Sequence, residues 1–562
     1  MNTDYISEVF PTKMRFVILL REGCLNFIKN VPFLTSAVSY FLLYLFMPKG
    51  RFAWPNGQWF ICAVAALIAL IWVSAQIKPL HLIQSGGPLA MKIIAFISSI
   101  GTALFPYLRF LEALAKRTGD GSLLSEKYVG GILCLLSVYF IFVCTLFVFA
   151  KLKTGAERTK LFDDVTKPEI VMYGIIVIML SLVIAIAFKK TLAFWGASHQ
   201  YDIIYTSDTP SLLKGNVFLN LEHPENDIRQ PLFAVYSAPF MGIPFLFSKF
   251  FCQSGYGTAL FVGVTQIIML VFSFFLLSRV LNLSSWKRMC FMLFCFSSYT
   301  FLLASIMIEQ YVGAFFWLMW AIYIYSRLGQ IDCLSFCGAS GSLAASVVLF
   351  PMLSRERCRL NFKKYILDLL AGGGAFLFSF VAFFKSWILV DSVQQIRQLE
   401  RFAGGGIPFA DRRMMYFAFV KNCFAAPAAS VNTALHKYPT WQLVTPLSQN
   451  KMGMLILLLS VLSFIVNRKK KCTAVFLLWV CFSIVMLLFV GWGTQENGLI
   501  LYSLYFGWAF LALIFQLVNA IEEKVKMPVL LPTTMLLSLL FLALNMKSFY
   551  DMLKFAVVYY PN

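Results

Sequence analysis

Residues 195–231, WGASHQYDIIYTSDTPSLLKGNVFLNLEHPENDIRQP, form a polar stretch inside an otherwise apolar chain. Carboxylates are scarce in this protein, which has only 26 aspartates and glutamates in 562 residues. Five of them lie in this stretch, together with the histidines His199 and His223: Asp202, Asp208, Glu222, Glu225 and Asp227. Such a concentration indicates either a functional site or a strongly solvated linker. Because apolar membrane segments flank the stretch on both sides, we expect it at a membrane surface.

The composition predicts the fold class. Hydrophobic residues make up 60% of the chain and charged residues only 13%, which lies outside the range of soluble domains. Apolar runs of about 17–25 residues, the length needed to cross a bilayer, recur along the whole chain. We therefore predict an all-α polytopic membrane protein with about 13–14 transmembrane helices. The net charge of +21 lies mostly in short loops between these runs, which favours a role in membrane topology over nucleic-acid binding.

The basic loops assign the sides of the membrane. Residues 151–167 contain five lysines and arginines, which is typical of a cytoplasmic loop. Four earlier spans then leave the N-terminus in the cytoplasm, and a span over 169–188 carries the polar stretch to the outside. We expect an N-terminal membrane region, 1–167, and a membrane core, 168–562, with outer loops at 191–231 and 391–451. Later spans are predicted at 257–280, 289–306, 311–327, 365–389, 452–467, 473–491, 499–520 and 527–546.

Two apolar runs do not fit as simple crossings. If 232–251 crossed the membrane, Arg279, Lys287 and Arg288 would lie outside, against the charge rule. This run also contains Pro239 and Pro244, so we predict a helix that lies in the outer interface. The run 333–353 would similarly expose a basic loop, and we predict a bent or re-entrant pair around Gly338–Gly341.

Several motifs in the core resemble the GT-C superfamily of membrane glycosyltransferases, which includes the protein O-mannosyltransferases and the aminoarabinose transferase of lipid A. Asp202 and Asp208 resemble the acidic position near the start of the large outer loop in that group. DIRQPLF at 227–233 is similar to the motif that introduces its interfacial helix, and Glu309 to a later acidic position. The segment GTQENGLILYSLYFGWAFLAL, at 493–513, resembles its late span pair. The resemblance covers roughly 168–550, but the first four spans and the spacing of Asp202 and Asp208 depart from the family pattern.

This resemblance implies transfer of a sugar from a polyprenyl-phosphate carrier to a lipid or glycan acceptor at the outer face of the membrane. A carboxylate at a partly dehydrated surface suits the base that removes the acceptor proton. Asp208 is our first choice, followed by Asp202 and Glu309. The expected substrate-binding residues, including cations for the lipid phosphate, are Lys189, Lys190, Asp227, Arg229, Arg412, Arg413 and Glu496. We expect the protein in the bacterial inner membrane.

Each of these residues has a structural alternative. Asp208 in Ser-Asp-Thr-Pro fits the cap of a helix, Glu225 and Asp227 fit a solvated turn, and arginine pairs at a membrane face anchor headgroups. A divalent metal ion stays open, because His199, Asp202, Asp208 and His223 offer ligands without a zinc motif.

Two other functions also stay open. A polysaccharide polymerase or ligase of another fold would use a large late loop, where Arg412, Arg413 and His436 lie. A flippase or other transporter of lipid-linked sugar would show charged residues within several spans or an internal repeat.

Overall fold

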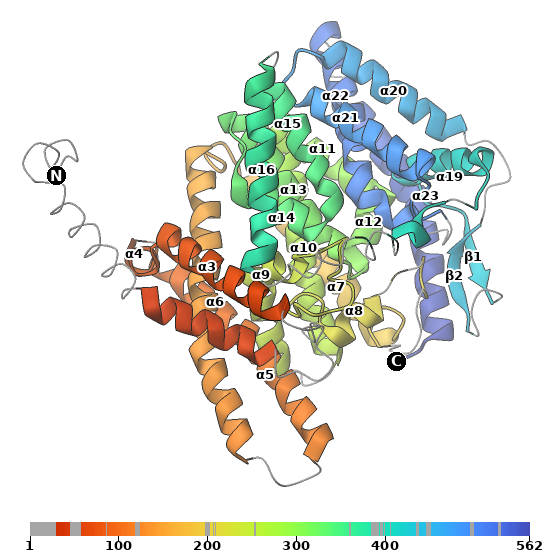
Figure 1. The fold of residues 1–562 in the computed structure, drawn as a ribbon. Coiled ribbons are helices and arrows are strands. Elements are labelled where there is room, and N and C mark those ends of the chain that lie inside the picture. Colours follow the sequence, from red (N-terminus) through yellow and green to blue (C-terminus); the bar gives the residue numbers. More distant parts are fainter. Residues whose placement is uncertain are drawn as a thin grey trace, which may run out of the picture. The chain divides into compact units, whose positions relative to one another are not determined.

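The computed structural model describes most of the chain and confirms an all-α polytopic membrane protein (Figure 1). The chain divides into two compact units, Met1–Lys153 with Val381–Phe384, and Thr154–Phe380 with Lys385–Asn562. The residues outside the description are 1–29, 45–57, 86, 119–123, 197–202, 206, 208, 252–254, 359–360, 384–392, 394–396, 398, 405, 434–437, 445–450, 495–498 and 527–529.

The first unit contains long apolar helices. Residues 30–44 are helical and pack on α6 through the rings of Phe33 and Phe140, whose centroids lie 5.2 Å apart. Ser36 on the same segment accepts a hydrogen bond from the backbone N–H of Phe140 at 2.7 Å. The helices of this part of the chain are α3 (Gln58–Ile77), α4 (Pro79–Ser85), α5 (Leu89–Thr118) and α6 (Leu124–Arg158).

The second unit is a helical bundle with one small antiparallel sheet. Its elements before the second outer loop are α7 (Lys167–Lys190), α8 (Thr209–Gly215), α9 (Phe233–Phe251), α10 (Gly255–Val280), α11 (Ser285–Ser297), α12 (Tyr299–Ile306), α13 (Gln310–Leu328), α14 (Cys333–Ser342), η1 (Ala344–Val348), α15 (Leu349–Cys358) and α16 (Phe362–Ala382). The later elements are η2 (Glu400–Phe402), α19 (Phe409–Asn422), β1 (Ala429–Asn432), β2 (Thr440–Leu443), α20 (Lys451–Asn467), α21 (Thr473–Ser483), η3 (Ile484–Phe489), η4 (Leu499–Tyr502), α22 (Ser503–Val525) and α23 (Leu530–Tyr559).

Nine helices in the described part of the chain are long and apolar enough to cross a membrane, and the bent pair α11 and α12 raises this number to ten. The sequence predicted about 13–14. The difference arises mainly at α13, α20 and α21, where crossings were predicted. Helices α20 and α21 are short, and α13 is buried along nearly its whole length. A helix surrounded by protein does not need a lipid-compatible surface, so its composition carries a weaker membrane signal.

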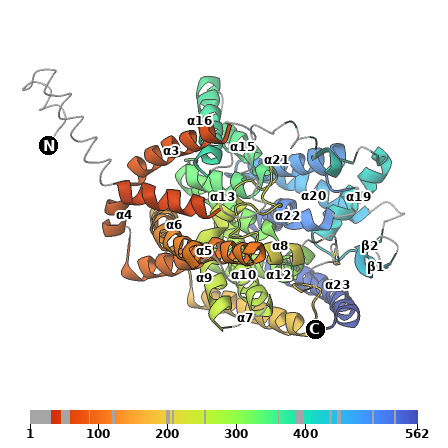
Figure 2. The same cartoon turned by 60° about the horizontal axis from the view of Figure 1, so that its bottom comes forward.

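Helices α10, α13 and α22 form the interior of the second unit (Figure 2). The most apolar stretch of α22 is 78% buried and that of α10 is 67% buried. The corresponding stretches of α7 and α23 are each only 22% buried. The exposed apolar side chains of α7 and α23 are therefore suited to face lipid.

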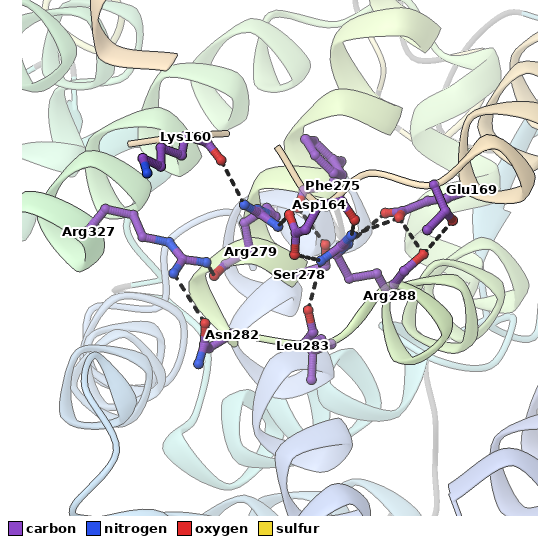
Figure 3. Close-up of polar contacts among 12 residues, drawn as sticks. Lys160, Asp164, Glu169, Phe275, Ser278, Arg279, Asn282, Leu283, Arg288 and Arg327 are labelled. Atoms are coloured by element: carbon purple, nitrogen blue, oxygen red, sulfur yellow. Dashed lines mark hydrogen bonds and ion pairs between the residues drawn. The ribbon is translucent and has the colours of Figure 1, made fainter. Parts of the chain in front are cut away.

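An ion-pair network joins the loops at one end of this bundle (Figure 3). Arg288 donates two hydrogen bonds to Glu169, of 2.7 and 2.8 Å, and both side chains are fully buried. Asp164 pairs with Arg279 and with Arg288. Burial alone would raise the pKa of the Asp164 carboxyl, but hydrogen bonds from Arg279 and Arg288 outweigh this effect and hold the pKa below its usual range.

The other loops with predicted cytoplasmic positions reach the same end. Arg327, at the end of α13, donates to the carbonyl of Arg279 at 2.8 Å. Lys471, in the turn between α20 and α21, donates to the carbonyl of Ser326 at 2.6 Å, and Lys470 pairs with Glu523 of α22. We call this the basic end of the bundle. The loops that meet there are among those that the charge rule places together on one side of the membrane.

Helix α9 does not run along the bundle from one end to the other. At its first residue, Phe233 packs against Gly313, near the start of α13. Near its last turn, Ser248 accepts a hydrogen bond of 3.1 Å from Thr258, near the start of α10. Because α10 and α13 both finish at the basic end, their starts lie at the opposite end. Both ends of α9 therefore contact the outer halves of α10 and α13, although the length and composition of α9 would allow a crossing.

The run 333–353 is not a single helix. It consists of α14, η1 and part of α15, with a break at Leu343, which has extended backbone geometry. With ten residues, α14 spans about 15 Å and is too short to cross a bilayer. The interrupted run agrees with the predicted bent or re-entrant pair.

Candidate functional site

The two predicted outer loops are joined by backbone hydrogen bonds. In the polar stretch, Tyr205 donates to the carbonyl of Trp441 at 2.9 Å, and Trp441 donates to the carbonyl of Ile203 at 2.7 Å. The hydroxyl of Tyr205 also accepts from the indole of Trp441 and contacts the hydroxyl of Tyr299 at 2.7 Å. Residues on strand β2 and in the polar stretch therefore form one surface at the end opposite the basic end.

A compact charged turn lies within the polar stretch. Arg229 donates to Glu225 at 2.6 Å and, through Nε, to Asp227 at 3.1 Å. The backbone N–H of Arg229 also donates to Asp227, at 2.8 Å. His223 accepts a hydrogen bond from the backbone N–H of Glu225 through Nδ1, so its imidazole supports the same turn. These contacts agree with the alternative that Glu225 and Asp227 stabilise a turn, although this turn is only partly solvated.

The turn is fixed to the interrupted helix run. The carbonyl of Arg229 accepts from the backbone N–H of Ala344 at 2.7 Å, and the backbone N–H of Leu232 donates to the carbonyl of Gly341 at 2.9 Å. The break after α14 leaves these backbone groups available, because they lack their regular helical partners. The predicted re-entrant run thus positions the segment that introduces α9.

Aromatic residues from later parts of the chain cover this turn. The guanidinium of Arg229 lies 4.6 Å from the centre of the Phe402 ring, a cation–π contact. Phe402 packs against Trp492, whose indole donates to the hydroxyl of Tyr502 at 3.1 Å. The Tyr502 ring packs edge-on against Tyr311, with centroids 5.6 Å apart. Tyr311 in turn interacts electrostatically with both Glu309 and Arg229.

Glu309 holds a second part of the polar stretch. Its carboxylate accepts a hydrogen bond of 2.7 Å from the hydroxyl of Ser207, and its carbonyl accepts from Gln266 at 2.6 Å. Thr209 contacts the Ser207 hydroxyl at 2.7 Å and donates to the carbonyl of Ile308 at 3.0 Å. The segment just before α8 is therefore bound to the start of α13.

We call the following set the outer cluster: Ser207, Glu225, Asp227, Arg229, Glu309, Tyr311, Phe402, Trp492 and Tyr502. It combines residues from both sides of α9, from the second outer loop and from the turn before α22.

The charges of the cluster favour proton chemistry over anion binding at the charged turn. Burial raises the pKa of the Asp227 carboxyl above its usual value, although Arg229 opposes this shift. Burial lowers the pKa of Arg229, but the neighbouring Asp227 and Glu225 outweigh that effect and raise it. Because one arginine faces two carboxylates, the turn has a formal charge of −1 when all three are ionised. Arg229 is thus poorly suited to neutralise a phosphate by itself.

The other predicted site residues have varied positions. Asp202 and Asp208, the two preferred bases, lie outside the described residues, as do Glu496, His199 and His436. Helix α8 begins at Thr209, directly after Asp208, so Ser-Asp-Thr-Pro does precede a helix as predicted. Lys189 and Lys190 end α7, where their carbonyls accept hydrogen bonds from Asn562 near the chain end.

Arg412 and Arg413 both belong to α19, but their surroundings differ. Arg413 is exposed, whereas Arg412 is half-buried and donates to the carbonyl of Phe489 at 2.5 Å. The aliphatic part of Arg412 contacts Gly491, next to Trp492 of the outer cluster. The Nε atom of Arg412 is buried without a hydrogen-bond partner, and no carboxylate pairs with this arginine in the described part of the chain.

Sequence reasoning missed the aromatic members of the cluster and Ser207. Tyr311 is the second residue of α13, and Tyr502 directly precedes α22. A tyrosine at the end of an apolar helix resembles an interfacial anchor in the sequence. Their convergence depends on the packing of α13 near α22, for which a single sequence contains no direct signal. Among the described residues, no group of three histidine, cysteine, aspartate or glutamate side chains is placed to share a metal ion.

Comparison with protein-family models, with curated proteins and with solved structures gives no match to this chain.

Proposed function

We propose that this protein is a membrane glycosyltransferase that moves a sugar from a polyprenyl-phosphate carrier to a lipid or glycan acceptor at the outer face of the membrane. The observation that supports this proposal most is the bond between Glu309 and Ser207, which holds the segment next to Asp208 against the start of α13. The resemblance of the same positions to the GT-C superfamily supports it independently.

In the proposed reaction, a carboxylate accepts the proton of the acceptor hydroxyl as its oxygen attacks the anomeric carbon of the sugar. The new C–O bond forms while the bond from the anomeric carbon to the phosphate oxygen breaks, and the electron pair leaves with the lipid phosphate. Asp208 and Glu309 are the carboxylates to which we assign the base. The Tyr311 and Tyr502 rings, each with an apolar face and a polar hydroxyl, suit an amphipathic sugar.

Neutralisation of the leaving phosphate is assigned to Arg412 rather than to Arg229. Arg229 is paired with two carboxylates, whereas Arg412 bonds only to a backbone carbonyl among the described residues. A guanidinium that keeps its positive charge is the better ligand for a lipid phosphate.

The test is a transfer assay in membranes from a deletion strain, permeabilised with detergent and supplied with the extracted lipid donor and acceptor. We expect the wild-type protein to restore acceptor glycosylation. Glu309→Gln or Asp208→Asn should lower the rate by about 100-fold or more while the protein still inserts normally. Arg412→Gln should also lower the rate, and the exposed Glu400→Gln, in the second outer loop, is the matched control.

This assay also separates the alternatives. Permeabilised membranes present no barrier, so a flippase would not be needed for transfer and its deletion would have no effect in the assay. If Glu309→Gln, Asp208→Asn and also Asp202→Asn transfer sugar at the wild-type rate, none of the three carboxylates is the base. A late-loop ligase then becomes the better interpretation, and Arg413→Gln would be the next variant.

A further inference from the structure

The basic end of the bundle contains a cavity of about 430 Å³. It is formed where the ends of α10, α13 and α22 meet the turn between α20 and α21. The side chains that matter here are Arg279, Asn282, Arg327, Lys470, Lys471 and Glu523. All belong to the second compact unit, far from the outer cluster along these helices.

Positive charge exceeds negative charge in this cavity. Four of its lining residues are cations and one, Glu523, is a carboxylate. Glu523 pairs with Lys470 at 3.1 Å, and Arg279 pairs with Asp164, which does not line the cavity. Among the described residues, Arg327 and Lys471 bond only to neutral oxygens, namely backbone carbonyls and the side chain of Asn282.

Two guanidinium groups in the wall keep unused donors. The Nε atoms of Arg279 and of Arg327 are both buried and have no hydrogen-bond partner. Arg279 is only 6% exposed, and its position is fixed by its bonds to Asp164 and to the carbonyl of Lys160 (Figure 3). Both Nε atoms are closed off from solvent, so a ligand in the cavity would meet the positive charge of these guanidinium groups rather than these two donors.

A role in topology alone does not account for this arrangement. Cations that only set the sides of the membrane can point into solvent, as the exposed Arg468 and Lys469 of the same turn do. Arg327 is half-buried, and Lys471, although also exposed, bonds to the carbonyl of Ser326. Both line one concave site, with amide groups of Asn282, Gln516 and Asn519 beside them.

We propose that this cavity binds a phosphate-bearing anion. Its position at the helix ends, on the side that the charge rule assigns to the cytoplasm, makes the headgroup of an anionic lipid the expected source of the phosphate. This site is separate from the outer cluster, so the proposal does not depend on the glycosyltransferase function.

The test uses the purified full-length protein in neutral detergent. Binding is followed by thermal stabilisation and by native mass spectrometry with three probes: phosphatidylglycerol, phosphatidylcholine and inorganic phosphate. The variants are Arg327→Gln and Lys471→Gln, singly and together. The matched control is Arg468→Gln with Lys469→Gln, which lowers the net charge at the basic end by the same amount as the cavity pair but lies outside the cavity wall.

We expect phosphatidylglycerol to bind and phosphatidylcholine not to stabilise. Each cavity variant should weaken binding by about 5-fold, because one cation near an anionic headgroup contributes about 1 kcal/mol. The control pair should bind nearly as well as the wild type. Binding of inorganic phosphate alone would support the phosphate site and assign it to a soluble ligand. The proposal is wrong if the control pair weakens binding as much as the cavity pair. It is also wrong if neither phosphatidylglycerol nor inorganic phosphate binds.

Discussion

Replacement of Arg288 by methionine should destabilise the protein more than removal of any exposed cation at the basic end. Arg288 is fully buried and makes five hydrogen bonds, two to Glu169, two to Asp164 and one to the carbonyl of Leu283. Arg288→Met removes all five and leaves the buried Glu169 with only the hydroxyls of Tyr173 and Ser285 as donors. Breaking a buried ion pair in this way costs about 3–5 kcal/mol.

The reverse change should cost less. In Glu169→Gln, Arg288 keeps Asp164 as a charged partner, so the loss is that of hydrogen bonds to one charged group, about 1.5–3 kcal/mol. The double variant should cost less than the sum of the two single variants, because it leaves no isolated charge in the buried site. The pair of Lys470 and Glu523 is exposed and serves as the reference for a small loss of stability. Lys470→Met should lower the free energy of unfolding by only about 0–1 kcal/mol.

The measurement is unfolding of the purified protein by sodium dodecyl sulfate in mixed micelles, followed by tryptophan fluorescence. All variants are compared at one protein and detergent concentration. The reasoning is refuted if Arg288→Met unfolds at the same detergent fraction as Lys470→Met. It is equally refuted if the effects of Glu169→Gln and Arg288→Met add without coupling, because a direct buried pair requires coupling.

Four further predictions concern the second unit. A Cβ at Gly453 would lie 1.9 Å from a backbone carbonyl of α19, so Gly453→Ala should separate α19 from α20 and lower stability by about 1–3 kcal/mol. Gly174→Ala, where a Cβ meets nothing within 4 Å, should be neutral or stabilising by up to about 1 kcal/mol in the same unfolding assay. Asn545 is fully buried and bonds three backbone groups, so Asn545→Leu should cost about 1–3 kcal/mol or more and raise protease sensitivity. Because the folded pKa of Asp164 lies below its usual 3.8, the stability that it contributes is present above that pH and lost as pH falls through the folded pKa. Asp164→Asn should remove this acid-side loss in unfolding curves measured from pH 3 to 6.

The gathering of the basic loops at one end of the bundle could be predicted from sequence, because the distribution of lysine and arginine is a one-dimensional signal. The charge rule also predicts that 232–251 does not cross the membrane, and this stays a prediction, because α9 is long and apolar enough to cross. The number of spans was harder to predict. Helix α13 contains three tyrosines and two tryptophans and packs against protein, so its hydropathy does not distinguish a crossing helix from a buried helix of a soluble protein.

The candidate site could be predicted only where it coincides with a local motif. The run around Arg229 and the isolated Glu309 were visible as charges at the ends of apolar segments. Pairing of Arg229 with both Glu225 and Asp227 was not visible, and it changes the chemistry from a free cation to a turn with excess negative charge. The Tyr311–Tyr502 contact depends on helix packing, which sequence patterns alone do not specify.

The position of α9 has a consequence for biosynthesis. Helix α10, against which α9 packs most extensively, begins only four residues after α9 ends, but α13 begins roughly 60 residues after it and is synthesised about 3 to 12 s later at 5–20 residues per second. During that interval α9 lacks its contacts with α13, and its insertion as a crossing would invert every later loop. Helix α9 is less apolar than α10 and contains two internal prolines, which disfavour that insertion. We expect these features to act on the nascent chain, by keeping α9 from inserting until α13 has been synthesised.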